Sequence, residues 1–201
     1  MVDRSPVAEI RILGPLGVTG PPAAALGGPR QRSLLVLLAV NLGCPISRDR
    51  IIDAIWSDPP PSAVSTIQGY VSHLRRAFEG HPVGIDFSGG AYVLVGDVRL
   101  VDASRFEAAT AKASLLLRSD RERDVRDALT TVEAALALWR GPALDGFLDA
   151  PFAHPEATRL EQRRIEAGAL RARALLELGR SADAIGALEP LVEEQPYDEE
   201  L

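Results

Sequence analysis

Apolar residues recur at helical spacing through residues 62–76, which read SAVSTIQGYVSHLRR. Ile67, Val71 and Leu74 fall on one face, so the pattern predicts an amphipathic helix with a plain core stripe. The opposite face carries small polar side chains, a glycine and cations: Ser65, Gln68, Gly69, Ser72 and Arg76. A helix that lies in a DNA major groove needs that mixture, because short polar groups reach base edges and Arg reaches bases or phosphates. An ordinary solvated surface helix also has a polar face, so the neighbouring elements must decide.

The chain before this helix predicts a small sheet followed by two helices. Short strands are expected at Ala8–Leu13, at Leu16–Val18 and at Ala23–Leu26, separated by Gly-Pro breaks. Pro29 suits the first turn of a helix at Arg30–Asn41, whose apolar middle predicts a buried core helix. Ser47 can cap a second helix over Arg48–Trp56.

Two more strand candidates, Val83–Phe87 and Ala91–Val95, flank Ser88-Gly89-Gly90 and predict a β-hairpin. The order is therefore sheet, three helices, hairpin. A helix, a turn, a helix with a polar outer face and a following hairpin make a winged helix-turn-helix. The fold class expected for this half is α+β, and the order of elements favours DNA binding over a merely solvated helix face.

Three motifs carry a family resemblance: GGPRQRSLLVLLAVN at 27–41, IIDAIWSDPPPSAVSTIQGYVSHLRRAF at 51–78 and GGAYVLV at 89–95. In this order they resemble the OmpR-type winged-helix domain of the SARP/AfsR family, to which EmbR-like regulators are related. The family consists of bacterial activators of secondary-metabolism gene clusters. Its domain arrangement implies that residues 1–98 form the winged-helix domain.

The second half predicts helices only. Asp102 can cap a helix through Leu116, another should follow near Asp124, and a long one is expected over residues 151–178. ALWRGPALDGF at 137–147 resembles a signature of the bacterial transcriptional activation domain of the same family, and residues 181–196 resemble a tetratricopeptide-type helix. Residues 99–201 are therefore expected to form an all-α, TPR-like domain that is truncated at its C-terminal end, since a helical array needs a capping element.

Charge separates the halves. Residues 1–99 hold 9 Arg and 8 Asp or Glu, whereas residues 100–201 hold 13 Arg or Lys and 20 Asp or Glu. A near-neutral half binds DNA if its cations cluster, and the acidic half suits protein partners better. One cysteine, no secretory signal and no apolar run longer than Leu34–Val40 predict a cytoplasmic protein without membrane contact.

Sites for catalysis are missing from the sequence. There is no G-x-x-x-x-G-K-[ST] loop and no G-x-S-x-G elbow. The three His residues have no ligand spacing with Cys44. The chain is therefore expected to be no enzyme and to need neither a metal nor a cofactor.

The expected DNA contacts lie on three elements. Thr66, Gln68, Ser72 and Arg76 should face the groove, with His73 beside them. Two readings stay open for Arg75, which reaches a phosphate or only packs, and for Tyr92, whose hydroxyl reaches a phosphate or whose ring fills the core.

The first helix should contribute Arg30 and Arg32, which open it where N–H groups attract anions. Both are expected to contact phosphates of the DNA backbone.

The family resemblance implies a sequence-specific activator. It implies binding to direct repeats of double-stranded DNA, side-by-side homodimers on DNA and contact with RNA polymerase. A different class of protein is the alternative: an adaptor whose helical repeats bind a protein while the winged helix serves as a docking module. A docking helix would more often expose an apolar patch than the cations at Arg75 and Arg76.

Overall fold

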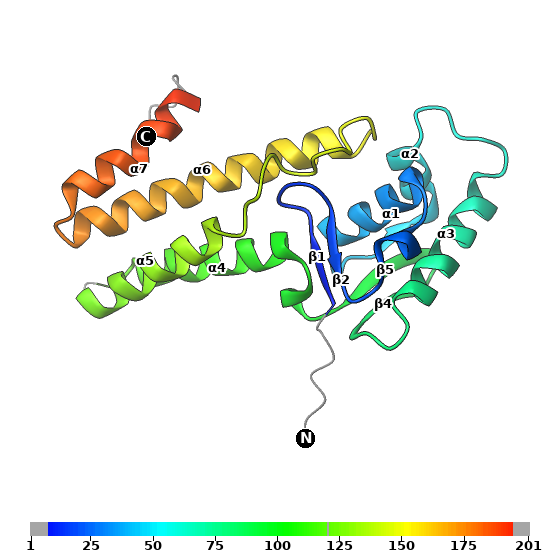
Figure 1. The fold of residues 1–201 in the computed structure, drawn as a ribbon, viewed down its shortest axis with the longest axis horizontal. Helices are drawn as coiled ribbons and strands as arrows, with labels where there is room; N and C mark the ends of the chain where they lie inside the picture. The colour runs from blue at the N-terminus through cyan, green and yellow to red at the C-terminus, as the bar shows by residue number, and fades with distance from the viewer. Residues whose placement is uncertain (1–7, 120, 195–201) are drawn as a thin grey trace. The chain divides into compact units, whose positions relative to one another are not determined.

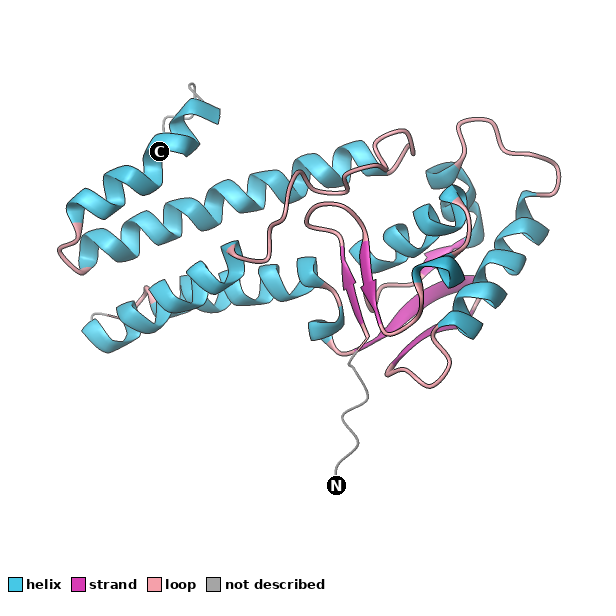
Figure 2. Ribbon diagram, viewed as in Figure 1, coloured by secondary structure: helices cyan, strands magenta, loops and turns pink. Residues whose placement is uncertain are grey.

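The computed structural model describes residues 8–119 and 121–194, and its helices and strands are shown in Figures 1 and 2. In chain order the elements are β1 (Glu9–Arg11), β2 (Gly17–Thr19), η1 (Ala23–Leu26), α1 (Pro29–Val40), β3 (Ile46–Ser47), α2 (Arg48–Ile55), α3 (Ala63–Ala77), β4 (Val83–Ser88), β5 (Ala91–Gly96), η2 (Val98–Leu100), α4 (Asp102–Leu116), α5 (Glu122–Leu136), α6 (Ala153–Glu177) and α7 (Ser181–Glu194).

The chain divides into two compact units. The first runs to Ser104 and also takes in Gly141–Thr158, and the second holds Arg105–Arg140 and the chain from Arg159 on. These units differ from the domains expected at 1–98 and 99–201, because the loop between α5 and α6 folds onto the first unit. The domain limits inferred from the family stay a prediction.

The winged helix is built on three helices whose apolar faces meet. Six consecutive residues of α1, Leu34–Ala39, are buried, as the all-apolar middle of that helix predicts. Ile51 and Ile55 of α2 and Ile67, Val71 and Leu74 of α3 are also buried. Ser47 caps α2 as expected, since its side chain accepts a hydrogen bond from the backbone N–H of Arg50.

The wing is the hairpin of β4 and β5, which pair from Val83↔Gly96 to Ser88↔Ala91. Gly89 and Gly90 both have positive φ, 59° and 82°, as a two-residue type I′ turn requires. A third strand, β3, pairs with β5 at Ile46↔Tyr92, so the strand order is β3-β5-β4. The pattern of β3 is too short for sequence periodicity to indicate it.

One expected strand is wrong. Residues Ala23–Leu26 form the short 3-10 helix η1, not a third strand of the first sheet, so among the described residues this sheet consists of β1 and β2. The backbone N–H of Ala25 donates to the carbonyl of Pro22 at 2.9 Å, which closes a turn. Alanine has low β propensity, so nothing in this stretch resists the turn.

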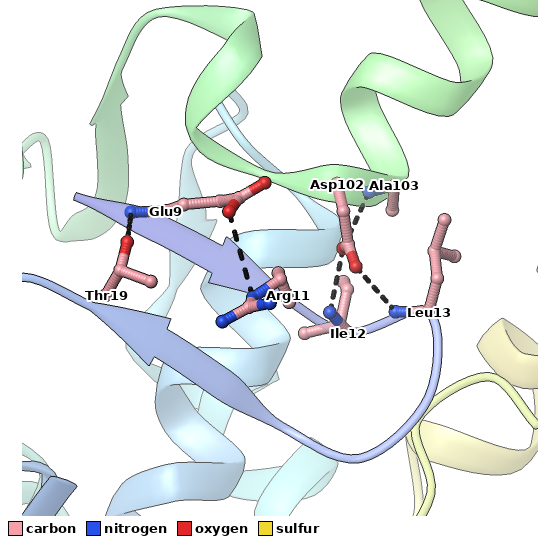
Figure 3. Close-up of polar contacts among 7 residues, drawn as sticks. All are labelled: Glu9, Arg11, Ile12, Leu13, Thr19, Asp102 and Ala103. Atoms are coloured by element: carbon pink, nitrogen blue, oxygen red, sulfur yellow. Dashed lines mark hydrogen bonds and ion pairs between the residues drawn. The ribbon is translucent and has the colours of Figure 1, made fainter. Parts of the chain in front are cut away.

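The first sheet is tied to the start of α4 by a buried carboxylate (Figure 3). Asp102 is 1% exposed and accepts hydrogen bonds from the backbone N–H groups of Ile12 at 2.7 Å and Leu13 at 3.1 Å. It also accepts from the N–H of Ala103 at 2.9 Å, the next residue along the chain. One side chain thereby fixes the end of β1 against the beginning of a helix about ninety residues later in the chain.

The loop between α5 and α6 is also hydrogen-bonded to the first unit, next to β1 and at α2. The N–H of Leu144 donates to the carbonyl of Ile12 at 3.0 Å, and the N–H of Phe152 donates to the carbonyl of Ala54 at 3.3 Å. Ala143, Leu144 and Phe152 are buried. Part of the signature at 137–147 is therefore a structural component of the first unit.

The second unit consists of helices, as expected (Figure 2). Trp139 meets the edge of Phe106 at 5.4 Å between ring centroids, and the Arg164 guanidinium lies 5.1 Å from the centroid of the Trp139 ring. Arg171 of α6 pairs with Glu133 of α5 at 3.1 Å. Gly179, with φ of 73°, ends the turn after α6, and α7 folds back along α6 (Figure 1).

Replacing the buried carboxylate should destabilise the first unit. Asp102→Asn keeps the shape of the side chain but brings an NH₂ group toward backbone N–H donors. We expect the free energy of unfolding to fall by ~1–3 kcal/mol, the cost of leaving buried donors unpaired. Urea denaturation followed by circular dichroism measures it. The exposed Asp145→Asn in the same unit is the control, and an equal effect of both variants would contradict this role.

Candidate DNA-binding surface

The helix α3 has the two faces that its sequence pattern predicts. Its buried residues are Ala63, Ile67, Val71 and Leu74, which pack against the core of the first unit. Gln68, Gly69, Ser72, His73 and Arg76 are exposed, and Thr66 is half-buried at the edge of that face. Apart from its chain neighbours and the backbone of its own helix, no atom lies within 4 Å of the position that a Cβ of Gly69 would occupy. The expected groove-facing residues therefore share one open side of α3.

The cations around α3 differ in how they are held. Arg75 donates from Nε to the backbone carbonyl of Ile85 in β4 at 2.7 Å. Arg32 donates from Nε to the carbonyl of Gly27 at 2.9 Å. Each of these guanidinium groups is thus anchored to the backbone through Nε. The anchoring bond does not use the two terminal nitrogens.

Arg30 lies over an aromatic ring. Its Cζ is 5.8 Å from the centroid of Trp56, which is buried and stacks with Tyr70 of α3 at 6.5 Å between centroids. A cation over an aromatic face is attracted by the ring quadrupole, so the Arg30 head group is positioned at the start of α1.

The side chains of His73 and Arg76 form no hydrogen bond or ion pair with the residues that the structure describes. Both are exposed on α3, one helical turn apart, and both line a hollow with Gln31 of α1. Both side chains carry N–H donors that are free to meet an anionic ligand.

The wing places Tyr92 and Phe87 together. Tyr92 is 5% exposed, so its ring fills the core, one of the two open readings; a contact between its hydroxyl and phosphate stays a prediction. Phe87 is 47% exposed, 4.7 Å from the Tyr92 ring, and Arg48 of α2 lies 5.8 Å over its face. Phe87 and Arg48 were missed from sequence, although Phe87 continues the alternation of Val83 and Ile85.

Charge at the junction after the wing is local. The Arg99 side chain donates hydrogen bonds to Asp97 and makes the largest contribution to lowering the pKa of that carboxyl to about 2. The backbone N–H of Arg99 also donates to Asp97 and contributes less. Asp97 is the N-cap of η2, Arg99 lies within it, and both are exposed. Their pairing caps this short turn.

Metal-binding geometry is absent from the part of the chain that the structure describes. No group of three or more His, Cys, Asp or Glu side chains is placed there to hold an ion. The free Cys44 is exposed in the turn between α1 and β3. None of the described helices combines the length and apolarity needed to cross a lipid bilayer.

A three-helix core, a helix with an open polar face and a hairpin wing define a winged-helix, DNA-binding transcriptional regulator. Residues 24–89 match the family described as "Transcriptional regulatory protein, C terminal". Residues 101–201 match the family described as "Bacterial transcriptional activator domain". The chain belongs to the SARP family of bacterial transcriptional regulators, which combine these two domains, and these matched families are regulators, not enzymes.

Relatives agree with this assignment along nearly the whole chain. EmbR of Mycobacterium tuberculosis is 35% identical, over 96% of this chain and 50% of its own length. AfsR of Streptomyces griseus is 32% identical over 94% of this chain and 19% of its own length. The chain spans about half the length of the EmbR proteins it matches.

A solved structure shares the fold. It is the structure of Mycobacterium tuberculosis EmbR in complex with a low-affinity phosphopeptide, with a TM-score of 0.83 and 33% identity. The match covers 96% of this chain and 52% of that one. The expected fold class, a winged helix followed by a helical domain, is confirmed.

Replacing each of the two adjacent arginines of α3 should change the free energy of unfolding by a different amount. Arg75→Ala removes the bond to Ile85 that ties α3 to the wing, so we expect the free energy of unfolding to fall by ~1 kcal/mol. Arg76→Ala removes an exposed cation whose side chain has no hydrogen-bond or ion-pair partner among the described residues, and it should change stability by less than ~0.5 kcal/mol. Urea denaturation of both variants measures the difference, and equal losses would show that the Arg75 bond contributes nothing.

Proposed function

We propose that this chain is a sequence-specific DNA-binding activator that inserts α3 into the major groove. The open polar face of α3 carries the proposal: Gln68, Ser72 and Arg76 lie beside Gly69, where a Cβ would meet no atom from another element. A groove reader needs short polar groups and close backbone approach on one side. Membership of the regulator family supports the same role.

The contacts divide by chemistry. Thr66, Gln68 and Ser72 offer hydrogen bonds to base edges, whereas Arg30, Arg32, His73, Arg75, Arg76 and Tyr92 contact the phosphate backbone. Backbone contacts fix register and orientation, and base contacts supply sequence information. The anchoring of Arg32 and Arg75 by Nε leaves their terminal nitrogens for phosphate and reduces the entropy lost on binding.

Two copies are proposed to bind side by side on direct repeats as a homodimer on DNA. Repeats about one helical turn apart, roughly 10–11 bp, place both copies on the same face of the duplex. The helical second unit then mediates the association and contacts RNA polymerase.

The second unit exposes three large apolar side chains: Leu115 of α4, Leu176 of α6 and Ile185 of α7. A contiguous patch of such side chains would favour protein contact, whereas single ones are common on protein surfaces. Relatives of the SARP family, including RedD of Streptomyces coelicolor at 29% identity over 95% of this chain and 56% of its own length, support a role in the control of a secondary-metabolism gene cluster.

The spacing of repeats tests the function. A gel shift uses the full chain and duplexes that it selects from a random library, carrying one repeat, two repeats, or two repeats separated by 5 additional base pairs. We expect cooperative binding to two repeats and its loss on insertion, because half a turn moves the copies to opposite faces. Failure to retard any selected duplex near physiological salt would favour the protein-binding adaptor instead.

Gly69→Ala tests the groove-facing side of α3. Alanine stabilises an exposed helix position by ~0.5–1 kcal/mol over glycine, and the structure leaves room for the added methyl group. We therefore expect higher stability together with DNA affinity lowered about tenfold, or ~1.4 kcal/mol, because the methyl group blocks close approach.

Gly186→Ala is the matched control for this variant. Gly186 is also exposed in a helix, α7, and its Cβ would meet no atom from another element. It should raise stability without changing DNA affinity. If Gly69→Ala also left DNA affinity unchanged, this face of α3 would not be the reading face.

A further inference from the structure

Two hollows flank one glutamine at the start of α1. One is lined by Ala25, Gly27, Gln31, His73, Arg76 and Ala77 and has a volume of about 310 Å³. The other is lined by Gly28, Pro29, Arg30, Gln31 and Tyr70 and has a volume of about 360 Å³. Gln31 is common to both, and neither lining contains a carboxylate. The hollows lie where the first turn of α1 approaches the exposed side of α3.

The Gln31 side-chain amide is buried, and its N–H donor lacks a hydrogen-bond partner in the described part of the chain. The residue is 4% exposed, and its Nε2 has no hydrogen-bond partner among the described residues. Buried polar side-chain atoms are nearly always paired in native proteins, and each exception calls for an unseen partner or a function. An N–H donor left unpaired beside two hollows and two cations suits an anionic acceptor.

The neighbouring loop holds that amide in place. Gly27 has φ of 72°, and a Cβ there would lie 2.5 Å from Oε1 and 2.8 Å from Nε2 of Gln31. The loop backbone therefore lies directly against the amide. The bond from Arg32 to the Gly27 carbonyl engages the acceptor of this loop with a cation, which reduces its repulsion of an anion.

The first turn of α1 adds to this positive potential. Gly28 at the N-cap has no side chain to satisfy the first N–H groups, and the turn contains no acidic residue. Free N–H groups and the helix dipole attract anions at such a terminus. His73 and Arg76 supply side-chain donors from α3 on one side, and Arg30 does so on the other.

We propose that this site, defined as Gln31, the first turn of α1, His73 and Arg76, binds a single phosphate oxyanion through Gln31 Nε2. The inference rests on the proposed DNA-binding function. It adds a phosphate contact from an uncharged side chain, the Gln31 amide, which the distribution of charge does not indicate. Gln31 is then a phosphate-positioning residue: it fixes one backbone phosphate at the flank of the groove that α3 reads. A free phosphoryl group has the same chemistry, so the experiment must separate the two sources.

Methylphosphonate substitution tests the DNA source. Each phosphate of a duplex selected by the full chain is made neutral in turn, and affinities are measured for wild type and Gln31→Met, which keeps the volume and removes the donor. We expect one phosphate position where neutralisation lowers the DNA affinity of wild type roughly tenfold, as the loss of a charge-assisted hydrogen bond predicts. Neutralisation at the same position should leave the DNA affinity of Gln31→Met unchanged. Gln68→Met is the matched glutamine control and should retain the wild-type loss at that position. Identical loss profiles for wild type and Gln31→Met would overturn the site as a DNA-phosphate site.

Arg76→Gln provides a second route if Gln31→Met fails to fold. Arg76 is exposed, so its replacement should leave the fold intact, and it should reduce the loss at the same phosphate. A loss profile of Arg76→Gln that matches wild type at every position counts against the site in the same way.

Inorganic phosphate tests the free source and separates the site from the function. Thermal unfolding of the full chain is compared in phosphate and chloride at equal ionic strength. Protection of wild type that is lost in Gln31→Met or Arg76→Gln supports the site even if no DNA is selected, which would sink the proposed function alone. Equal protection of all variants, together with no coupled methylphosphonate position, would overturn the site and leave the amide to a structural water.

Discussion

The buried carboxylate of Asp102 is the interaction on which the first unit depends. It gathers three backbone N–H groups from two distant parts of the chain, two of them at the end of β1. The carbonyl of Ile12 then receives the N–H of Leu144. A short two-stranded sheet is marginal by itself, and these contacts join it to α4 and to the loop before α6. The winged helix is therefore completed by residues outside residues 1–98.

The basic side chains near α3 differ in what holds them. Arg32 and Arg75 are bound to backbone carbonyls, and Arg30 lies over Trp56. The side chains of His73 and Arg76 have no hydrogen-bond or ion-pair partner among the described residues. Bound arginines position the α1 loop and the wing, so they contribute to the shape of the surface as well as to its charge. A near-neutral half can thus present a locally positive face, because the two hollows that Gln31 lines contain no carboxylate.

Sequence periodicity predicted the helices well, because apolar stripes such as Ile67, Val71 and Leu74 are long enough to define a period. It failed at Ala23–Leu26, where a turn after Pro22 outweighed a weak strand pattern, and it could not indicate the two-residue strand β3. For the site, residue types and faces were predictable, since exposure follows helical spacing. Contacts such as Arg75 with Ile85, Arg30 with Trp56 and the burial of Gln31 were not, because they depend on how separate elements pack.

Gln31 shows why such contacts matter for recognition. A cation at a phosphate acts over a distance and tolerates several orientations, whereas an amide hydrogen bond acts only at short range and in a narrow geometry. A buried amide held between Gly27 and α3 therefore favours one position of the backbone along α1, where mobile arginines would accept several. Once the backbone is fixed at that flank, the register of Gln68 and Ser72 against the base edges is fixed as well, since both belong to the same rigid helix as Arg76.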